Sequence, residues 1–244
     1  MKESDIALIT IVHDPTGLLV EPLKKVIAVI TNYFNYKYVA VSEFTAKELV
    51  ELLTLHHFKV FTVEKRGAAE ARRGIINLVG PFSHGYYHYC DLDRLVTWML
   101  MYPDELEMVH GEAINHDYLI LGRTKKAFIS HPVAWQETEL ISNKIFSVNF
   151  GQEVDICAGS CIMSRKALMQ IAEKSKSRIT DAEWPLIVGN MSTKQEIGFI
   201  ETDGLMYLDF NKSKASSELE EWHARVKLLF YISESIQEVQ KARE

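Results

Sequence analysis

The sequence contains little cysteine, no long apolar run and no leader-like opening. Its three cysteines, Cys90, Cys157 and Cys161, are an odd number and form no C-x-x-C pair, so neither a disulfide framework nor a zinc knuckle is indicated. No apolar stretch approaches the roughly 18 residues that a membrane-spanning helix needs, and the first residues, Met-Lys-Glu-Ser-Asp, lack the basic-then-apolar pattern of a signal peptide. We therefore expect a cytoplasmic protein with reduced cysteines.

The sequence also lacks an excess of positive charge. Its 244 residues carry 27 Lys and Arg against 33 Asp and Glu, a net charge of −6, and the pI is about 5.9. No broad basic face is expected, which argues against nucleic acid or an anionic membrane as a partner.

Two catalytic fingerprints are missing as well: the G-x-S-x-G elbow of hydrolases and the G-x-G-x-x-G loop of dinucleotide-binding enzymes.

Strands and helices alternate regularly through the first half of the chain. Short β-rich apolar runs predict strands at 6–12, 38–42, 60–63 and 86–90. Helical spacing follows each strand, and Thr45-x-x-Glu48 predicts a capping box that opens the second helix. This alternation indicates βαβ units and a mainly parallel sheet.

The second half predicts a different arrangement, with strands at 118–121 and 155–163, a helix at 139–148, and a hairpin of 197–201 with 205–209 about Asp203-Gly204. We therefore expect a mixed sheet. Residues 218–242 predict an amphipathic helix docked on the domain, with an apolar stripe formed by Leu219, Trp222, Val226, Leu229, Phe230, Ile236 and Val239. No internal repeat or linker is evident, so one continuous domain is the simplest organisation.

Two carboxylates, Asp91 and Asp93, follow the predicted strand at 86–90. Residues two apart in extended backbone point the same way, so both can face the carboxyl edge of the sheet, where open α/β sheets bind ligands. Two such oxygen ligands suit Mg²⁺ or Mn²⁺, with a substrate diphosphate completing the shell. The alternative is that one Asp caps the following helix and the other is solvated.

Three short motifs around these carboxylates resemble a known family. The chain reads S-E-x-T at 42–45, G-x-x-x-A-R-x-G at 67–74 and Y-x-Y-C-D-L-D at 87–93. In this order they resemble the nucleotide-sugar-dependent glycosyltransferases of the A-type (GT-A) fold, especially family 2. The resemblance covers about residues 5–210.

The resemblance implies a single Rossmann-like α/β domain over 1–244: a nucleotide-sugar-binding half at 1–115, an acceptor-binding half at 116–210 and a helical extension at 211–244. It implies a hexosyltransferase-like enzyme that uses Mn²⁺ or Mg²⁺ to move one sugar from a UDP or GDP sugar. The acceptor would be a sugar, a lipid-linked compound or a small molecule. Because the chain lacks the Q-x-x-R-W motif that marks processive synthases, a single addition is expected; association into a homo-oligomer stays open.

Carried onto this sequence, the resemblance makes Asp93 a metal ligand and Asp91 a contact to the donor ribose or the metal. Glu43 matches an acid that often accepts a hydrogen bond from the donor base, and Arg72 matches the helix arginine. The first strand ends in donor-binding His13 and Asp14, where Tyr-Asn is common in the family. The sequence also departs from the pattern at Ser42, in place of an acid, and at Arg73, in place of Asn.

The acceptor side is matched by two segments. Residues 158–168 resemble the family's small-residue loop, in which Gly159 and Ser160 let a sugar approach the backbone, or else they form a plain strand-to-helix turn. Residues 180–184 resemble its acidic segment, which makes Asp181 the candidate catalytic base and Glu183 the second choice, with Trp184 in the acceptor site; a solvated helix start is the alternative. The stretch from His131 through Trp135 to Glu139 offers further aromatic and polar groups for a sugar site.

Two other functions stay open. A sugar-binding or scaffold protein could keep this fold without the chemistry. A sugar-phosphate nucleotidyltransferase also shares the fold, but it resembles a different signature, a G-x-G-x-R loop after the first strand, where this chain reads His13-Asp14-Pro15-Thr16-Gly17.

Overall fold

One mixed sheet runs through most of the chain. The computed structural model describes residues 6–190, 197–211 and 217–241, and within them the strands pair in the order β3-β2-β1-β4-β6-β5-β7. Only β6, among these strands, runs antiparallel to its neighbours, β4 and β5. The predicted mixed, mainly parallel sheet is confirmed. The strands are β1 (Ile6–Val12), β2 (Lys37–Ser42), β3 (Lys59–Val63), β4 (Tyr86–Cys90), β5 (Tyr118–Arg123), β6 (Ser160–Ser164) and β7 (Ile197–Thr202).

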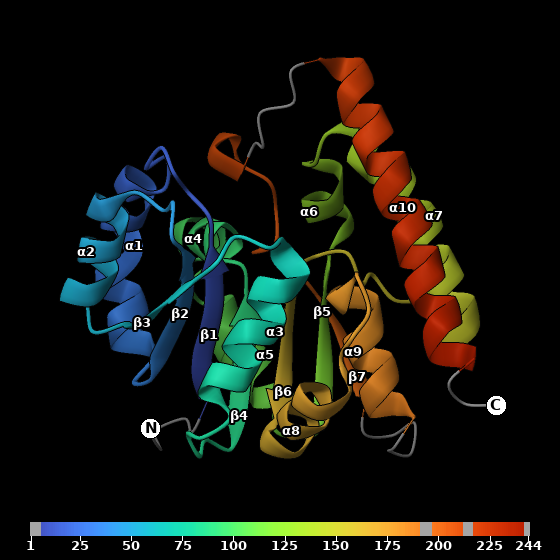
Figure 1. Ribbon diagram of the computed structural model, residues 1–244, viewed down its shortest axis with the longest axis horizontal. Helices are drawn as coiled ribbons and strands as arrows, with labels where there is room; N and C mark the ends of the chain where they lie inside the picture. Colours follow the sequence, from blue (N-terminus) through green and yellow to red (C-terminus); the bar gives the residue numbers. More distant parts are fainter. Residues whose placement is uncertain (1–5, 191–196, 212–216, 242–244) are drawn as a thin grey trace.

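Helices cover both faces of the sheet (Figure 1). Alternate residues of β1 point to opposite faces: Leu8 packs with α1, α2, α4 and α5, whereas Ala7 and Ile9 pack with α3, α8, α9 and α10. Each face thus has its own apolar core. The helices are α1 (Val20–Tyr33), α2 (Lys47–Leu55), α3 (Ala68–Val79), α4 (Leu92–Met101), α5 (Glu105–Ala113), α6 (Lys125–Ile129), α7 (Val133–Phe150), α8 (Arg165–Lys174), α9 (Thr180–Gly189), α10 (Glu218–Lys241) and the 3₁₀ helix η2 (Asp209–Asn211).

The carboxyl ends of the parallel strands β1 to β5 and β7 meet at one edge of the sheet, uppermost in Figure 1. At this edge the chain leaves β1 at His13, β2 at Glu43 and β4 at Asp91. Residues far apart in the sequence are therefore brought together there, as the sequence predicts for the candidate site.

The predicted capping box of the second helix is wrong. Helix α2 begins two residues later, at Lys47, with Ala46 at the N-cap and no side-chain capping bond. The hydroxyl of Thr45 instead lies 3.0 Å from the Ser42 hydroxyl and donates to the Val12 carbonyl at 3.4 Å. Thr45 therefore ties the end of β2 to the end of β1.

The strand predicted at 155–163 is too long, because β6 begins only at Ser160. Asp155 is buried and held by Arg123, whose Nε donates to Asp155 Oδ2 at 2.7 Å. Gly159 then adopts a left-handed φ of 72°, which breaks an extended strand. The chain reaches the sheet only after this turn.

The hairpin predicted about Asp203-Gly204 is also wrong. The backbone N–H groups of Asp203 and Gly204 donate to the Glu105 carboxylate at 2.8 Å each, and a Cβ on Gly204 would collide with Trp98. The chain is thereby turned away from the sheet and enters η2, while β7 pairs in parallel with β5.

Helix α10 forms as predicted but docks with only part of the predicted stripe. It packs on α7 and α9, with Ile232 and Ile236 buried. Leu219, Val226 and Phe230 of the predicted stripe are more than half exposed, so the helix docks through the remainder of its apolar residues. None of the described helices is both long and apolar enough to cross a membrane.

Candidate active site

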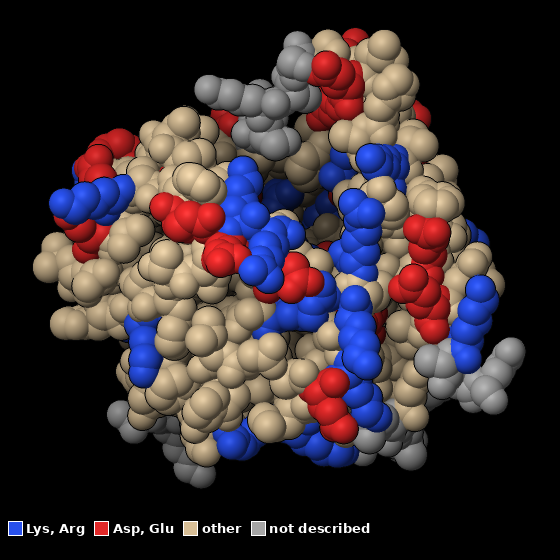
Figure 2. All heavy atoms as spheres, in the orientation of Figure 1, with Lys and Arg blue, Asp and Glu red and all other residues tan. Residues whose placement is uncertain are grey.

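A cavity of about 310 Å³ opens at the carboxyl edge of the sheet. We call it the main cavity; it lies between the start of α3, the end of β4 and helices α7 and α10. Figure 2 shows it as a hollow on this face of the molecule, with Lys and Arg side chains in its depth and at its rim. Its polar lining includes Arg72, Asp91, Asp93 and Asp181, all named from the sequence.

Arg72 is the centre of the hydrogen bonding in this cavity. Its guanidinium donates to Asp91 Oδ2 at 2.8 Å and to the carboxylate of Asp181, and also to the hydroxyls of Tyr89 at 2.9 Å and Thr180 at 3.1 Å. Burial disfavours its charge, but Asp181 and Asp91 outweigh that effect and hold the pKa of Arg72 well above its ordinary value. Burial raises the pKa of Asp181 despite the neighbouring arginine.

Asp91 and Asp93, two residues apart, follow the end of β4. Asp91 occupies the N-cap position of α4 but makes no capping hydrogen bond with its side chain; its carboxylate instead accepts from Arg72 and Tyr89. Asp93 Oδ2 accepts from the amide of Asn211 at 2.9 Å. Burial raises the pKa of Asp93, and the nearby charge of Asp91 adds to the rise. The capping alternative is therefore not what holds these side chains.

The two carboxylates fit a divalent cation that is shared with a ligand. Both line the main cavity and also a second cavity of about 290 Å³ beside the end of β1. Burial disfavours the charge of Asp93, and a nearby cation would offset that cost. Within the described part of the chain, no cluster of three or more His, Cys, Asp or Glu side chains is arranged to hold a metal. Further ligands would therefore have to come from substrate oxygens or water.

Two cavities lie beside the end of β1. The second cavity is lined by the loop after β1 and by Asp91 and Asp93. A third cavity, of about 260 Å³ and mostly apolar, lies between the ends of β1, β2 and β3 and the start of α3. His13 lines both, and its Nδ1 lies 2.7 Å from the Ser42 hydroxyl. Asp14 is buried and accepts from the N–H groups of Leu18 and Leu19 at 3.0 and 2.8 Å, so its carboxylate shapes the turn.

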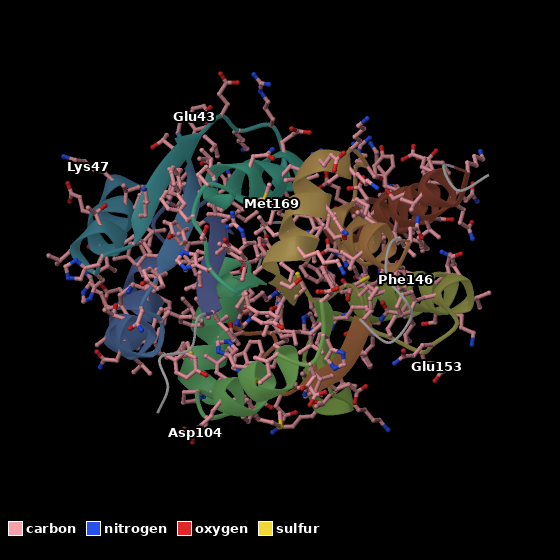
Figure 3. The ribbon with its side chains drawn as sticks, turned by 90° about the horizontal axis from the view of Figure 1, so that it is seen from below. Glu43, Lys47, Asp104, Phe146, Glu153 and Met169 are labelled. Carbon is pink, nitrogen blue, oxygen red and sulfur yellow. The ribbon has the colours of Figure 1, made fainter. Side chains whose placement is uncertain are left out.

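Glu43 lies apart from these cavities. It is exposed, and Figure 3 places it at the outer rim of the molecule. The third cavity is lined instead by its neighbour Ser42 and by Glu64 from the end of β3. The structure therefore does not bring Glu43 together with the other donor-side residues, and its role stays a prediction.

The acceptor-side residues divide into two groups. Gly159 and Asp181 line the main cavity. Gly159 is required there, because a Cβ at this left-handed residue would lie 3.1 Å from Asp91 Oδ2. Ser160 and Trp184 line only a small pocket behind Tyr89, where the Ser160 hydroxyl donates to the Tyr89 carbonyl at 2.9 Å and the Trp184 ring packs edge-on against Tyr89.

Glu183 points away from the main cavity. It is buried, and its carboxylate accepts from the Ser175 hydroxyl and from the backbone N–H groups of Lys176 and Ser177. It thereby fixes the connection between α8 and α9. Of the two acids named for the catalytic base, the structure brings only Asp181 to the cavity.

Four polar residues of the cavity lining have no place in the motifs of the sequence: Arg94, Arg178, Asn211 and Arg225. Trp135 and Glu139, which belong to the aromatic and polar stretch named from the sequence and lie in the first two turns of α7, line the cavity as well. The sequence could have indicated Arg225, because helical spacing places it three residues before Leu228 and seven before Ile232, on the packed face of α10. Arg178 and Asn211 leave none.

Solved structures of enzymes from Mycobacterium tuberculosis share this fold. Glucosyl-3-phosphoglycerate synthase superposes with a TM-score of 0.62 at 11% identity, covering 99% of this chain and 81% of that one. Its complex with Mn²⁺, UDP-glucose and phosphoglyceric acid gives 0.59 at 11% identity over 96% and 80%. Its complex with Mn²⁺, UDP-glucose and glycerol 3-phosphate gives 0.58 at 11% over 99% and 80%. Comparisons with protein-family models and with curated proteins found no match. The likeness confirms the predicted A-type glycosyltransferase fold.

We expect Arg72→Ala to lower the free energy of unfolding at pH 7 by about 3 kcal/mol, because it leaves two largely buried carboxylates without their cation. The loss should shrink toward pH 5, because burial raises the pKa of Asp181 and removal of Arg72 takes away a charge that lowers it, so protonation of Asp181 favours the native state. Urea unfolding at the two pH values measures both effects.

Two variants test the origin of that loss. Adding Asp181→Asn to Arg72→Ala should recover part of the stability, because one of the unpaired charges is removed. Arg66→Ala breaks a pair that is about two-thirds exposed, and it should cost no more than about 0.5 kcal/mol. Equal losses in Arg66→Ala and Arg72→Ala would contradict this account of the network.

Proposed function

We propose that the chain is a glycosyltransferase that moves one sugar, a hexose by its resemblance, from a nucleotide-diphosphate sugar to a hydroxyl group of an acceptor. One observation carries the proposal: Asp91 and Asp93 line both the main cavity, which Asp181 also lines, and the second cavity beside β1. A donor diphosphate between the two would place its sugar in the main cavity. The fold shared with an enzyme solved with UDP-glucose and Mn²⁺ supports this assignment.

On the donor side, Asp91 and Asp93 would hold Mn²⁺ or Mg²⁺ together with the diphosphate. When bound, such a cation stabilises the negative charge that builds on the diphosphate as the sugar leaves. Arg72 fixes Asp91 and Asn211 fixes Asp93 by hydrogen bonds, so both carboxylates are oriented before the donor enters. Orientation in advance lowers the cost of reaching the transition state.

The third cavity suits the donor base, because its lining is mostly apolar and lies at the ends of three strands. Ser42 and His13 offer polar groups at its wall, with Glu64 nearby. The resemblance assigns base reading to Glu43, and the cavity lining favours Glu64. Either carboxylate could accept an N–H of uracil or guanine.

At the acceptor, the attacking hydroxyl oxygen forms a bond to the anomeric carbon while the bond from that carbon to the diphosphate oxygen breaks. In an inverting reaction Asp181 takes the hydroxyl proton and the nucleotide diphosphate leaves with the bonding electron pair. Burial raises the pKa of Asp181, which makes its carboxylate a stronger base. Arg72 holds that carboxylate at the wall of the main cavity.

We expect Asp93→Asn to lower turnover with UDP-glucose and Mn²⁺ at least 100-fold, since a bridging cation contributes several kcal/mol to the transition state. Its melting temperature should change little, because the substitution removes a charge that burial disfavours. Released UDP measures turnover. Asp104→Asn, an exposed position on the far rim (Figure 3), is the matched control. Wild-type turnover in a folded Asp93→Asn variant would rule out the metal role, and a wild type without metal-dependent binding or turnover would indicate a scaffold.

Base recognition is tested by comparing Glu43→Ala with Glu64→Ala. Loss of one hydrogen bond to a charged acceptor costs about 1.5–3 kcal/mol. Substitution of the residue that binds the base should therefore weaken UDP binding roughly ten- to a hundred-fold. Calorimetry with UDP and Mn²⁺ gives both dissociation constants. An unchanged constant removes the substituted residue from the site, and unchanged constants in both would remove the base from the third cavity.

For the catalytic base, we expect Asp181→Asn to lower kcat about 10²- to 10⁴-fold while UDP binding stays near normal. Glu183→Gln should lower the melting temperature instead, because Glu183 holds the α8–α9 connection. Full activity in Asp181→Asn with an inactive but folded Glu183→Gln would transfer the role to Glu183. Full activity in both would exclude the inverting mechanism, because a retaining enzyme can use its leaving diphosphate as the base.

A further inference from the structure

Arginines gather at the end of the main cavity that faces α10. Arg178 comes from the connection between α8 and α9, Arg225 from α10 and Arg94 from α4, and all three line the cavity together with Trp135 of α7. Three segments distant in the sequence therefore each contribute an arginine to the lining of one cavity. The Lys and Arg side chains seen in the hollow of Figure 2 agree with this clustering.

The carboxylates that pair with arginines beside α10 pair with Arg123 and Arg225, and they leave Arg94 and Arg178 without a carboxylate partner among the described residues. Asp155 is held by Arg123, whose Nη1 also lies 2.7 Å from Glu139 Oε2. Glu139 pairs with Arg225 as well, so two guanidinium groups share one buried carboxylate. The other acids of the lining are Asp91 and Asp181, which are paired with Arg72, and Asp93, which accepts a hydrogen bond from Asn211 and lies near the charge of Arg94.

Arg178 has no carboxylate partner among the described residues. Its guanidinium carbon lies 3.6 Å from the centre of the Tyr231 ring on α10. Arg225 lies 4.1 Å from the centre of the Trp135 ring, whose Nε1 donates to Glu221 at 3.0 Å. Stacking on aromatic rings holds a guanidinium in place while its N–H donors stay available.

We propose that this end of the main cavity binds a phosphate or carboxylate group of the acceptor, with Arg178 and Arg225 as its principal partners. The inference rests on the proposed function and names the class of acceptor: a small hydroxyl compound that carries negative charge. Arginine donors match the oxygens of such a group in pairs, and the anion would neutralise the excess charge. Asp181, which lines the same cavity, would face the acceptor's hydroxyl.

Binding measurements on the full chain test this assignment. Inorganic phosphate, glycerol 3-phosphate and 3-phosphoglycerate are titrated by calorimetry, each with and without UDP and Mn²⁺, and glycerol serves as the neutral counterpart. At least one anion should bind more tightly than glycerol, and Arg178→Ala should weaken that binding about ten- to a hundred-fold, the range for a lost charge-assisted hydrogen bond. Arg225→Lys keeps a positive charge beside Glu139 but loses the paired N–H donors of the guanidinium, so it should weaken anion binding as well.

Matched variants separate the cavity from general charge. Lys176→Ala and Lys227→Ala remove the same charge from the same segments at exposed positions outside the cavity lining, and both should bind the anions as the wild type does. A second arm uses vesicles with and without phosphatidylglycerol. Binding that depends on Arg178 supports the site. Whether the bound anion is a soluble compound or the lipid headgroup identifies the source of the anion.

Three results would overturn the proposal: no binding of any anion, equal binding in Arg178→Ala and the wild type, or weakening of UDP binding in place of anion binding. The last would move Arg178 to the donor. Failure of UDP with Mn²⁺ to bind the wild type would contradict the proposed function. The two failures can be told apart, because the anion titrations without UDP still report on the arginines.

Discussion

The buried guanidinium of Arg72 joins two carboxylates that come from opposite halves of the chain. Asp91 directly follows the fourth strand, in the first half, and Asp181 lies in the first turn of α9, in the second half, 90 residues later. Without the arginine these two acids would repel each other across a buried space. With it, the end of β4 and the start of α9 are held at one wall, and the main cavity has a defined shape.

The division of charge around this wall organises the proposed chemistry. Acidic groups at the end of β4 suit a cation and a diphosphate, whereas the arginines near α10 suit an anion. Helix α10 takes part through a buried ionic cluster in which Glu139 lies between Arg123 and Arg225. Such a cluster costs free energy to desolvate and loses far more when one member is removed. It therefore fixes the position of α10 more strictly than its half-exposed apolar stripe does.

The sequence predicts the sheet well because strand patterns and helix periods are local. It predicts Asp91, Asp93, Arg72 and Asp181 as a group because they belong to recognisable motifs, and all four line one cavity. The errors arise where distant contacts decide the local structure: Glu105 and Trp98 turn the chain at Gly204, and Arg123 captures Asp155 before β6. Arg178 and Asn211 are missed for the same reason, since their function depends on a cavity formed by other segments.

We propose that the carboxyl end of β4 holds the metal and diphosphate of a nucleotide sugar. A crystal structure of the chain with UDP and Mn²⁺ tests it most directly. We expect a metal peak bound by Asp91 or Asp93 and by diphosphate oxygens, with the uracil ring in the apolar cavity between the ends of β1, β2 and β3. UDP bound without metal, or bound away from both aspartates, would contradict the account.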